Sequence, residues 1–345
     1  MRNFIFCLAI LPFFFLAHGS NAQDPQFSQF YSAPLYINPA FAGSTQMGRA
    51  GVNFRNQWPS IDASFVTYSA YFDYFLERYN SGVGLILMND REGSAGLTST
   101  TVGFNYAYQL YLNNSLVFRP GFSAGFVSRA LDFDKLTFGN QFDPLTGRFN
   151  TSVPTGEAIG DRTSYFDLGL GGLLYGNNFW LGIAVSHITE PNQSFFDDGE
   201  SGLPMKTSFH AGYKFPLPVS PRMSGRDEFG RERSITPNAQ YKTQGEFDQL
   251  DLGVYVTWEP IVLGVTYRGL PVDGSDGVSR NESVILILGY SDQDIKVGYS
   301  YDFTISALGL DSGGAHEISF SYQFPIAKDR LRPPRHIMQV PCPNF

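Results

Sequence analysis

Large apolar residues alternate with small or polar ones along most of the chain after residue 47. In one segment Val102, Phe104 and Tyr106 are large and apolar, whereas the intervening Gly103 and Asn105 are small or polar. A period of two is typical of a β-strand with two different faces. A helix would spread the same residues around its whole surface. The alternation therefore predicts a chain made of strands.

Fourteen segments carry this pattern. We expect strands at residues 48–56, 62–75, 82–89, 97–110, 115–128, 163–176, 179–189, 205–215, 233–241, 247–258, 261–269, 282–290, 294–303 and 315–324. Many have about the 9–11 residues that a tilted strand needs to cross a bilayer. An even number of strands brings both ends of a bacterial barrel to one side. The predicted fold class is all-β, a transmembrane antiparallel β-barrel of about 14 strands in the outer membrane, spanning residues 48–324.

The connections between these segments alternate in length. Short links at 76–81, 111–114, 177–178, 259–260 and 291–293 alternate with long ones at 129–162, 190–204, 269–281 and 304–314. Outer-membrane barrels have short periplasmic turns and longer external loops. A soluble β-sandwich, the alternative, has no need for this alternation. One long basic connection, 216–231, is an exception that falls on the periplasmic side.

The two ends of the chain lie outside the predicted barrel. Residues 1–22 are typical of a signal peptide, because Arg2 precedes an apolar stretch and Ser20-Asn21-Ala22 supplies small residues for cleavage. We expect the mature chain to begin near Gln23. Residues 23–47 are predicted to form an extended periplasmic segment, and residues 325–345 a proline-rich basic tail in the periplasm.

Composition narrows the functional classes. Charged residues make up 16% of the chain, against a typical figure of about 25%. Aromatic residues also reach 16%, with 36 glycines, which suits a sheet that meets lipid outside and encloses a crowded lumen. The net charge of −8 argues against a nucleic-acid partner.

The sequence offers little catalytic or metal-binding chemistry. Residues 121–125 match the G-x-S-x-G nucleophile pattern, but Ser123 lies within an alternating strand with no helix after it. The glycines around Gly171 also follow the strand period, and we expect them to pack closely in the lumen rather than bind a dinucleotide. Acidic pairs near Asp132 and Asp197 lack the spacing of a dedicated calcium site, so solvated loop charge is the favoured interpretation. We therefore expect no enzyme activity, no cofactor and no metal.

Two features of the sequence allow more than one interpretation. Cys342, the one cysteine left after signal removal, is either a tolerated free thiol or forms an intermolecular bridge or a contact to a partner. Large aromatic side chains also occur in the predicted external loops, where they either pack on each other or bind a partner. These residues are Phe138, Phe142, Phe149, Phe195 and Phe196.

The two flanks carry longer motifs. After the predicted signal peptide the chain reads Gln-Asp-Pro-Gln-Phe-Ser-Gln-Phe-Tyr (23–31) and then Pro-Leu-Tyr-Ile-Asn-Pro-Ala-Phe-Ala-Gly (34–43). Near the other end it reads Tyr-Asp-Phe-Thr (301–304), Ser-Gly-Gly-Ala-His-Glu-Ile (312–318) and Cys-Pro (342–343). In both flanks, and over the mature chain between them, the sequence resembles the PorP/SprF family of Bacteroidetes outer-membrane proteins.

This resemblance implies a role in the type IX secretion system and, in some members, in gliding motility. The expected partners are outer-membrane lipid, a cognate secreted adhesin with a C-terminal sorting domain, and secretion components that include a periplasmic peptidoglycan-binding lipoprotein. The five loop phenylalanines are candidates for binding the adhesin. The candidates for a periplasmic partner are Asp24, Pro25, Phe27, Arg330, Arg332, Arg335 and Cys342. The alternative function is a general outer-membrane porin or solute channel.

Overall fold

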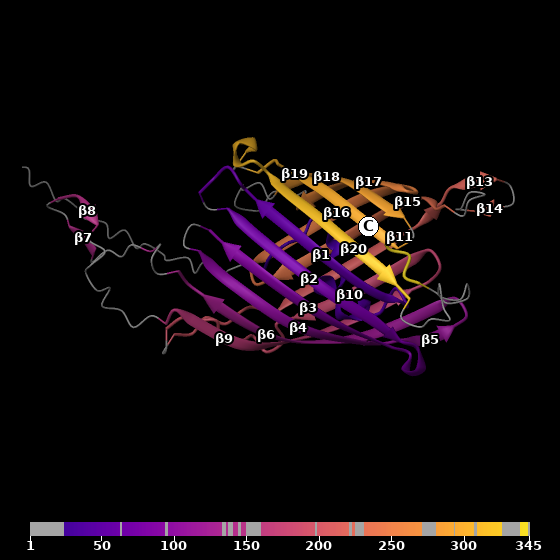
Figure 1. Ribbon diagram of the computed structural model, residues 1–345, viewed down its shortest axis with the longest axis horizontal. Helices are drawn as coiled ribbons and strands as arrows, with labels where there is room; N and C mark the ends of the chain where they lie inside the picture. The colour runs from indigo at the N-terminus through magenta and orange to yellow at the C-terminus, as the bar shows by residue number, and fades with distance from the viewer. Residues whose placement is uncertain are drawn as a thin grey trace, which may run out of the picture.

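The chain folds into one closed antiparallel β-barrel of 14 strands (Figure 1). The computed structural model describes residues 24–343 apart from 63, 94–95, 133–135, 137–140, 144–145, 150–159, 197–198, 221–222, 225–230, 271–280, 293, 307–308 and 326–338. The predicted fold class is confirmed. The largest difference in a strand boundary is three residues, as at Phe65, where the sequence analysis predicts a start at 62.

The barrel strands follow one another around the wall in chain order. They are β1 (Gly48–Gln57), β2 (Phe65–Leu76), β3 (Ser81–Glu92), β4 (Leu97–Tyr108), β6 (Leu116–Ala130), β9 (Arg162–Tyr175), β10 (Phe179–Ser186), β11 (Lys206–Tyr213), β15 (Arg233–Gln244), β16 (Phe247–Trp258), β17 (Ile261–Gly269), β18 (Asn281–Asp292), β19 (Ile295–Thr304) and β20 (Ala315–Phe324). Strand β1 pairs with β20 over their full length, so the sheet has no open edge there.

Shorter strands extend or decorate the two ends. These are β5 (Leu110–Asn113), β7 (Phe142–Asp143), β8 (Arg148–Phe149), β12 (Phe215–Pro216), β13 (Pro218–Ser220) and β14 (Met223–Ser224). Figure 1 shows the β7–β8 pair beyond one end of the barrel and the β13–β14 pair beyond the other. We call the first the long-loop end, because connections 131–161 and 187–205 lie there, and the second the short-turn end.

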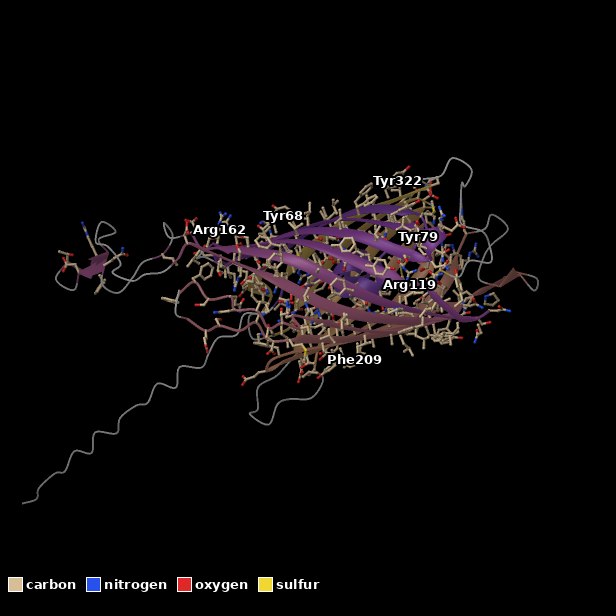
Figure 2. The ribbon with its side chains drawn as sticks, turned by 90° about the horizontal axis from the view of Figure 1, so that it is seen from below. Tyr68, Tyr79, Arg119, Arg162, Phe209 and Tyr322 are labelled. Carbon is tan, nitrogen blue, oxygen red and sulfur yellow. The ribbon has the colours of Figure 1, made fainter. Side chains whose placement is uncertain are left out.

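The two faces of the wall have opposite chemistry. On β19 the exposed positions include Ile295, Val297 and Tyr299, whereas Lys296 and Ser300, at alternate positions, are buried. Figure 2 shows Tyr68, Phe209 and Tyr322 at the periphery and Arg119 within the outline of the wall. This inside-out pattern, apolar outward and polar inward, is the arrangement that a barrel in lipid requires.

The segment before the first strand does not lie outside the barrel. Residues 24–47, which we call the plug, fill the lumen, and Phe27, Tyr31 and Phe41 are each at most 3% exposed. Residue 24 lies near the long-loop end, where Asp24 contacts Lys206, and the plug then descends to β1 at the short-turn end. The prediction of an extended periplasmic segment at 23–47 is therefore wrong for the residues described. The plug is too apolar to remain in water when a narrow lumen can bury it.

Short helices shape the plug. They are η1 (Phe30–Ser32), α1 (Pro34–Ile37) and η2 (Pro39–Phe41). Pro34 and Pro39 each begin a helix, where a residue without an N–H costs nothing. The Asn38 side chain accepts the Ala40 N–H and so caps η2. No helix among the described residues is long and apolar enough to cross a membrane.

Part of the C-terminal tail also reaches the plug. The Gln339 side chain donates to the Thr45 carbonyl at 3.0 Å, and Val340 and Cys342 pack against the buried cluster that contains Tyr31 and Trp180. The described residues 339–343 therefore lie against the base of the plug rather than free in the periplasm. The basic part of the tail, residues 326–338, lies outside the described residues.

Candidate functional site

Inward-facing glycines let the plug approach the barrel wall. A Cβ atom at Gly82 would lie 1.8 Å from the Ala42 carbonyl oxygen, and one at Gly171 would lie 2.0 Å from Asn38 Oδ1. Any other residue at either position would push the plug away from the wall. The expectation of close packing around Gly171 is thus confirmed, and the plug is what the glycines pack against.

Polar groups on β19 and β20 hold the upper half of the plug. The Glu317 carboxylate accepts the backbone N–H groups of Ser28 and Gln29 at 2.6 and 3.1 Å. The Ser28 hydroxyl donates to Asp302 at 2.6 Å. Arg55 pairs with Asp302 at 2.9 Å and with Glu317 at 3.3 Å. Both carboxylates therefore have a cationic partner, as buried charges require, while Asp302 Oδ1 accepts no hydrogen bond.

Asn38 and Arg119 hold the lower half. The Asn38 amide donates to the carbonyls of Gly172 and Ile183 at 3.1 and 3.0 Å. Arg119, which is 0% exposed, donates to the Ala40 carbonyl at 3.0 Å and also to the carbonyl of Ala42. An unpaired buried carbonyl costs about 1–3 kcal/mol, so each of these donors matters to the docked state.

The first described residue is held at the long-loop end by three side chains. Asp24 Oδ2 contacts the Lys206 ammonium and lies 2.8 Å from His187 Nε2, while His187 Nδ1 lies 3.0 Å from Asp167 Oδ2. Burial lowers the pKa of His187, but the Asp24 charge and hydrogen bonds to Asp167 and Asp24 outweigh burial and raise it to about 9. Burial raises the pKa of Asp24, but Lys206 and His187 hold it well below its usual range.

Two cavities flank the top of the plug. The larger, which we call the vestibule cavity, has a volume of about 330 Å³ and lies between the plug and the inward faces of β11, β15 and β16. Its apolar wall contains Phe27, Phe30 and Ile37. The smaller cavity, about 140 Å³, lies on the side of β4, β6 and β9. Asp24 and Pro25 line both cavities and so separate them.

Loop 187–205 covers the smaller cavity and is braced internally. The Asn192 side chain accepts the N–H groups of Ser194 and Ser201 at 3.0 and 2.9 Å. Its Leu203 is 5% exposed and lines the cavity. On the same loop Phe196 remains 51% exposed. A braced loop with an exposed aromatic residue has the character of a binding surface.

The other predicted loop aromatics have different surroundings. The Phe195 ring is half-buried, and the Arg129 guanidinium lies 5.9 Å from its centre. Phe142 is 44% exposed and pairs through its backbone with Phe149 between β7 and β8. Phe138 lies outside the described residues. Among the phenylalanines of this set whose exposure the structure describes, Phe142 and Phe196 are the exposed ones.

The predicted periplasmic candidates divide into three groups. Asp24, Pro25 and Phe27 lie inside the lumen toward the long-loop end, so their assignment to a periplasmic surface is wrong. Cys342 packs at the base of the plug, where burial raises the pKa of its thiol to about 11. The remaining candidates, Arg330, Arg332 and Arg335, lie outside the described residues.

The sequence analysis missed the buried charges of the lumen. Arg55, Arg119, Arg268, Asp302 and Glu317 are all at most 3% exposed. The sequence signal for these charges is their place in the strand alternation, since each occupies a position whose side chain faces the lumen. Their partners lie far away in the sequence, as with Arg55 and Glu317, which are separated by 262 positions.

Neither a metal site nor a serine–histidine pair is assembled among the described residues of the lumen. No group of three or more His, Cys, Asp or Glu side chains is placed to hold a metal ion within those residues. Ser123 and His187 both line the smaller cavity. However, each ring nitrogen of His187 faces a carboxylate, so neither is directed at the Ser123 hydroxyl.

Comparison with known proteins identifies relatives at the family level. The family described as type IX secretion system membrane protein PorP/SprF matches residues 19–322. No curated protein matches the sequence.

Similar solved structures are also barrels. The toluene transporter TodX of P. putida is 12% identical, with 84% of this chain and 93% of that one covered and a TM-score of 0.47. Omp33 of Acinetobacter baumannii is 8% identical, with 82% and 100% covered and a TM-score of 0.43. At these values neither likeness says anything about a ligand.

Proposed function

Because the chain belongs to the PorP/SprF family of type IX secretion system membrane proteins, we propose that it binds one secreted surface protein and anchors or escorts it. It is an outer-membrane protein with a 14-strand barrel. The proposed cargo is an adhesin that carries a C-terminal sorting domain. The binding surface we propose is the long-loop end, comprising loops 131–161 and 187–205 and the mouth between them.

The plugged lumen is the observation that carries this proposal. The plug makes buried contacts with β6, β9, β19 and β20, from Ser28 at the top to Ala42 at the bottom. A barrel closed in this way is suited to holding a partner at its mouth rather than passing solutes. A general porin needs a continuous aqueous path, and the plug lies across that path.

The exposed aromatics at the long-loop end support the same proposal. Aromatic residues dominate the energy of protein interfaces when they are buried on binding. Phe196 stands on a braced loop and so loses little conformational entropy when a partner covers it. Phe142 is the second such candidate.

We place a periplasmic partner of the secretion system at the short-turn end. The connection between Tyr213 and Arg233 carries the β13–β14 pair, which extends beyond the barrel there (Figure 1). The basic tail residues Arg330, Arg332 and Arg335 remain candidates for the same partner, a peptidoglycan-binding lipoprotein. We assign no catalytic step to this protein.

Deleting residues 190–204 from the chain in its native host tests the proposal. Loop deletion leaves the ladder of β10 with β9 intact, so the barrel still assembles, as heat-modifiable migration on gels would show. The adhesin is then expected in the culture medium instead of on the cells. The matched control removes residues 306–313, a loop at the same end without exposed phenylalanine. If the adhesin stays on cells that lack 190–204, that loop is not the dock.

A further inference from the structure

The vestibule cavity combines an apolar wall with an excess of acidic groups. Its lining contains Asp24, Glu246, Asp248 and Glu282 but only the two lysines Lys206 and Lys242. Phe27, Phe30 and Ile37 form its apolar part. Its volume of about 330 Å³ falls at the small end of the range for ligand pockets, about 300–1,000 Å³.

The positive charges of the lining are already engaged. Lys206 contacts Asp24, and Lys242 lies 3.8 Å from Asp251, which also receives Arg268 at 3.0 Å. Among the described residues the Glu282 carboxylate has no hydrogen bond or ion pair. Glu282 therefore lacks a direct ionic partner and is attracted only from a distance by Arg268, Lys242 and Arg55.

A second group points to the same kind of ligand. Gln240 lines the cavity on β15 and is 3% exposed, yet its Oε1 atom accepts no hydrogen bond. A buried polar atom without a partner costs free energy unless something supplies the missing donor. Glu282 and Gln240 both need a donor, and they come from different strands of the wall.

We infer that the vestibule cavity binds a basic side chain, arginine or lysine, of the secreted partner. The aliphatic part of such a side chain packs along the phenylalanines, and its charged end donates to Glu282 and Gln240. Arginine fits especially well because its guanidinium donates several hydrogen bonds in one plane. This inference rests on the proposed function, since it takes the secreted protein as the occupant.

Two capped hexapeptides test the inference on the purified full-length protein in detergent. One contains a single arginine beside a phenylalanine, and its twin has neutral citrulline in place of arginine. Hydrogen bonds to a charged group favour the arginine peptide by about 10- to 100-fold in Kd. Glu282→Gln is expected to reduce this preference to about threefold or less. The matched control Glu232→Gln removes a carboxylate at the short-turn end, where Glu232 pairs with Lys214 at 2.8 Å, and keeps the preference.

The outcomes separate this inference from the proposed function. Equal Kd values for the two peptides, or no binding of either at millimolar concentration, overturn the inference. It also fails if a folded Glu282→Gln protein retains the full preference. Retention of the adhesin on cells carrying Glu282→Gln would contradict the inference but leave the anchoring function standing. If cells that carry the wild-type barrel do not retain the adhesin, the proposed function itself is wrong.

Discussion

Removing the Arg119 side chain should release the plug without unfolding the barrel. In Arg119→Leu, the carbonyls of Ala40 and Ala42 lose their donor in a fully buried place. Hydrogen bonds to a charged group contribute about 1.5–3 kcal/mol each, so the docked plug loses about 3–6 kcal/mol. Since each 1.4 kcal/mol is a factor of ten, the undocked fraction rises at least about 100-fold.

A buried thiol on the plug measures this fraction. Ala33 is 1% exposed, so Ala33→Cys in a Cys342→Ser background reacts with a water-soluble maleimide only when the plug leaves its site. The labelling rate is then proportional to the undocked population. We expect Arg119→Leu to label at least about 100 times faster, and Arg119→Lys to fall between it and the parent.

The matched control is Arg78→Leu, because Arg78 lies over the Tyr79 ring in an exposed turn at the barrel end. It should label at the parent rate. A folded Arg119→Leu barrel that also labels at the parent rate would refute the reasoning, because the hydrogen bonds of Arg119 would then contribute nothing to docking.

Two further predictions concern the plug. His187 has a pKa raised to about 9 from 6.5, so its contact with Asp24 is at full strength below pH 6.5 and is lost as pH rises through 9. A nitroxide spin label at Gln26→Cys should gain mobility over that pH range, and His187→Gln should abolish the change. A flat mobility profile in the parent protein would contradict the assignment. Gly171→Val should displace the plug and speed Ala33→Cys labelling, because its Cβ would lie 2.0 Å from Asn38 Oδ1. At the neighbouring Gly172 the atom nearest to an added Cβ is 3.5 Å away, so Gly172→Val should label slowly. Equal labelling rates for the two variants would refute the close approach of the plug to Gly171.

The barrel wall could be predicted from the sequence because each strand meets two solvents of opposite polarity. On β20 the lipid-facing Ile318, Phe320 and Tyr322 alternate with the buried Glu317 and Ser319, so the period of two is undisturbed. The alternation of loop lengths then distinguished the two ends of the barrel. Both signals come from residues close together in the chain, so a single sequence is enough to detect them.

The plug could not be predicted because it has no period. Its proline residues are typical of an extended linker, and its short helices form only against the wall. A clue was present in its aromatic residues, since Phe27, Phe30 and Tyr31 are costly in an exposed segment. The matching clue was the glycine content of the inward faces, which reserves space for it.

The candidate site required distant pairing that no local pattern carries. Asp24 meets Lys206 across 182 positions, and Gln29 meets Glu317 across 288. The vestibule cavity likewise combines the plug with strands from the second half of the barrel. The exposed loop aromatics were nevertheless found from the sequence, because large apolar residues in long polar loops stand out locally.

Single-channel conductance in planar lipid bilayers tests most directly whether the N-terminal segment closes this barrel. The full-length protein should show no steady conductance, because residues 24–43 fill the lumen. A variant that lacks these residues should conduct steadily, since a 14-strand wall without its plug encloses an aqueous path. Steady conductance by the full-length protein at the level of the deletion variant would contradict the closed barrel and the binding role built on it.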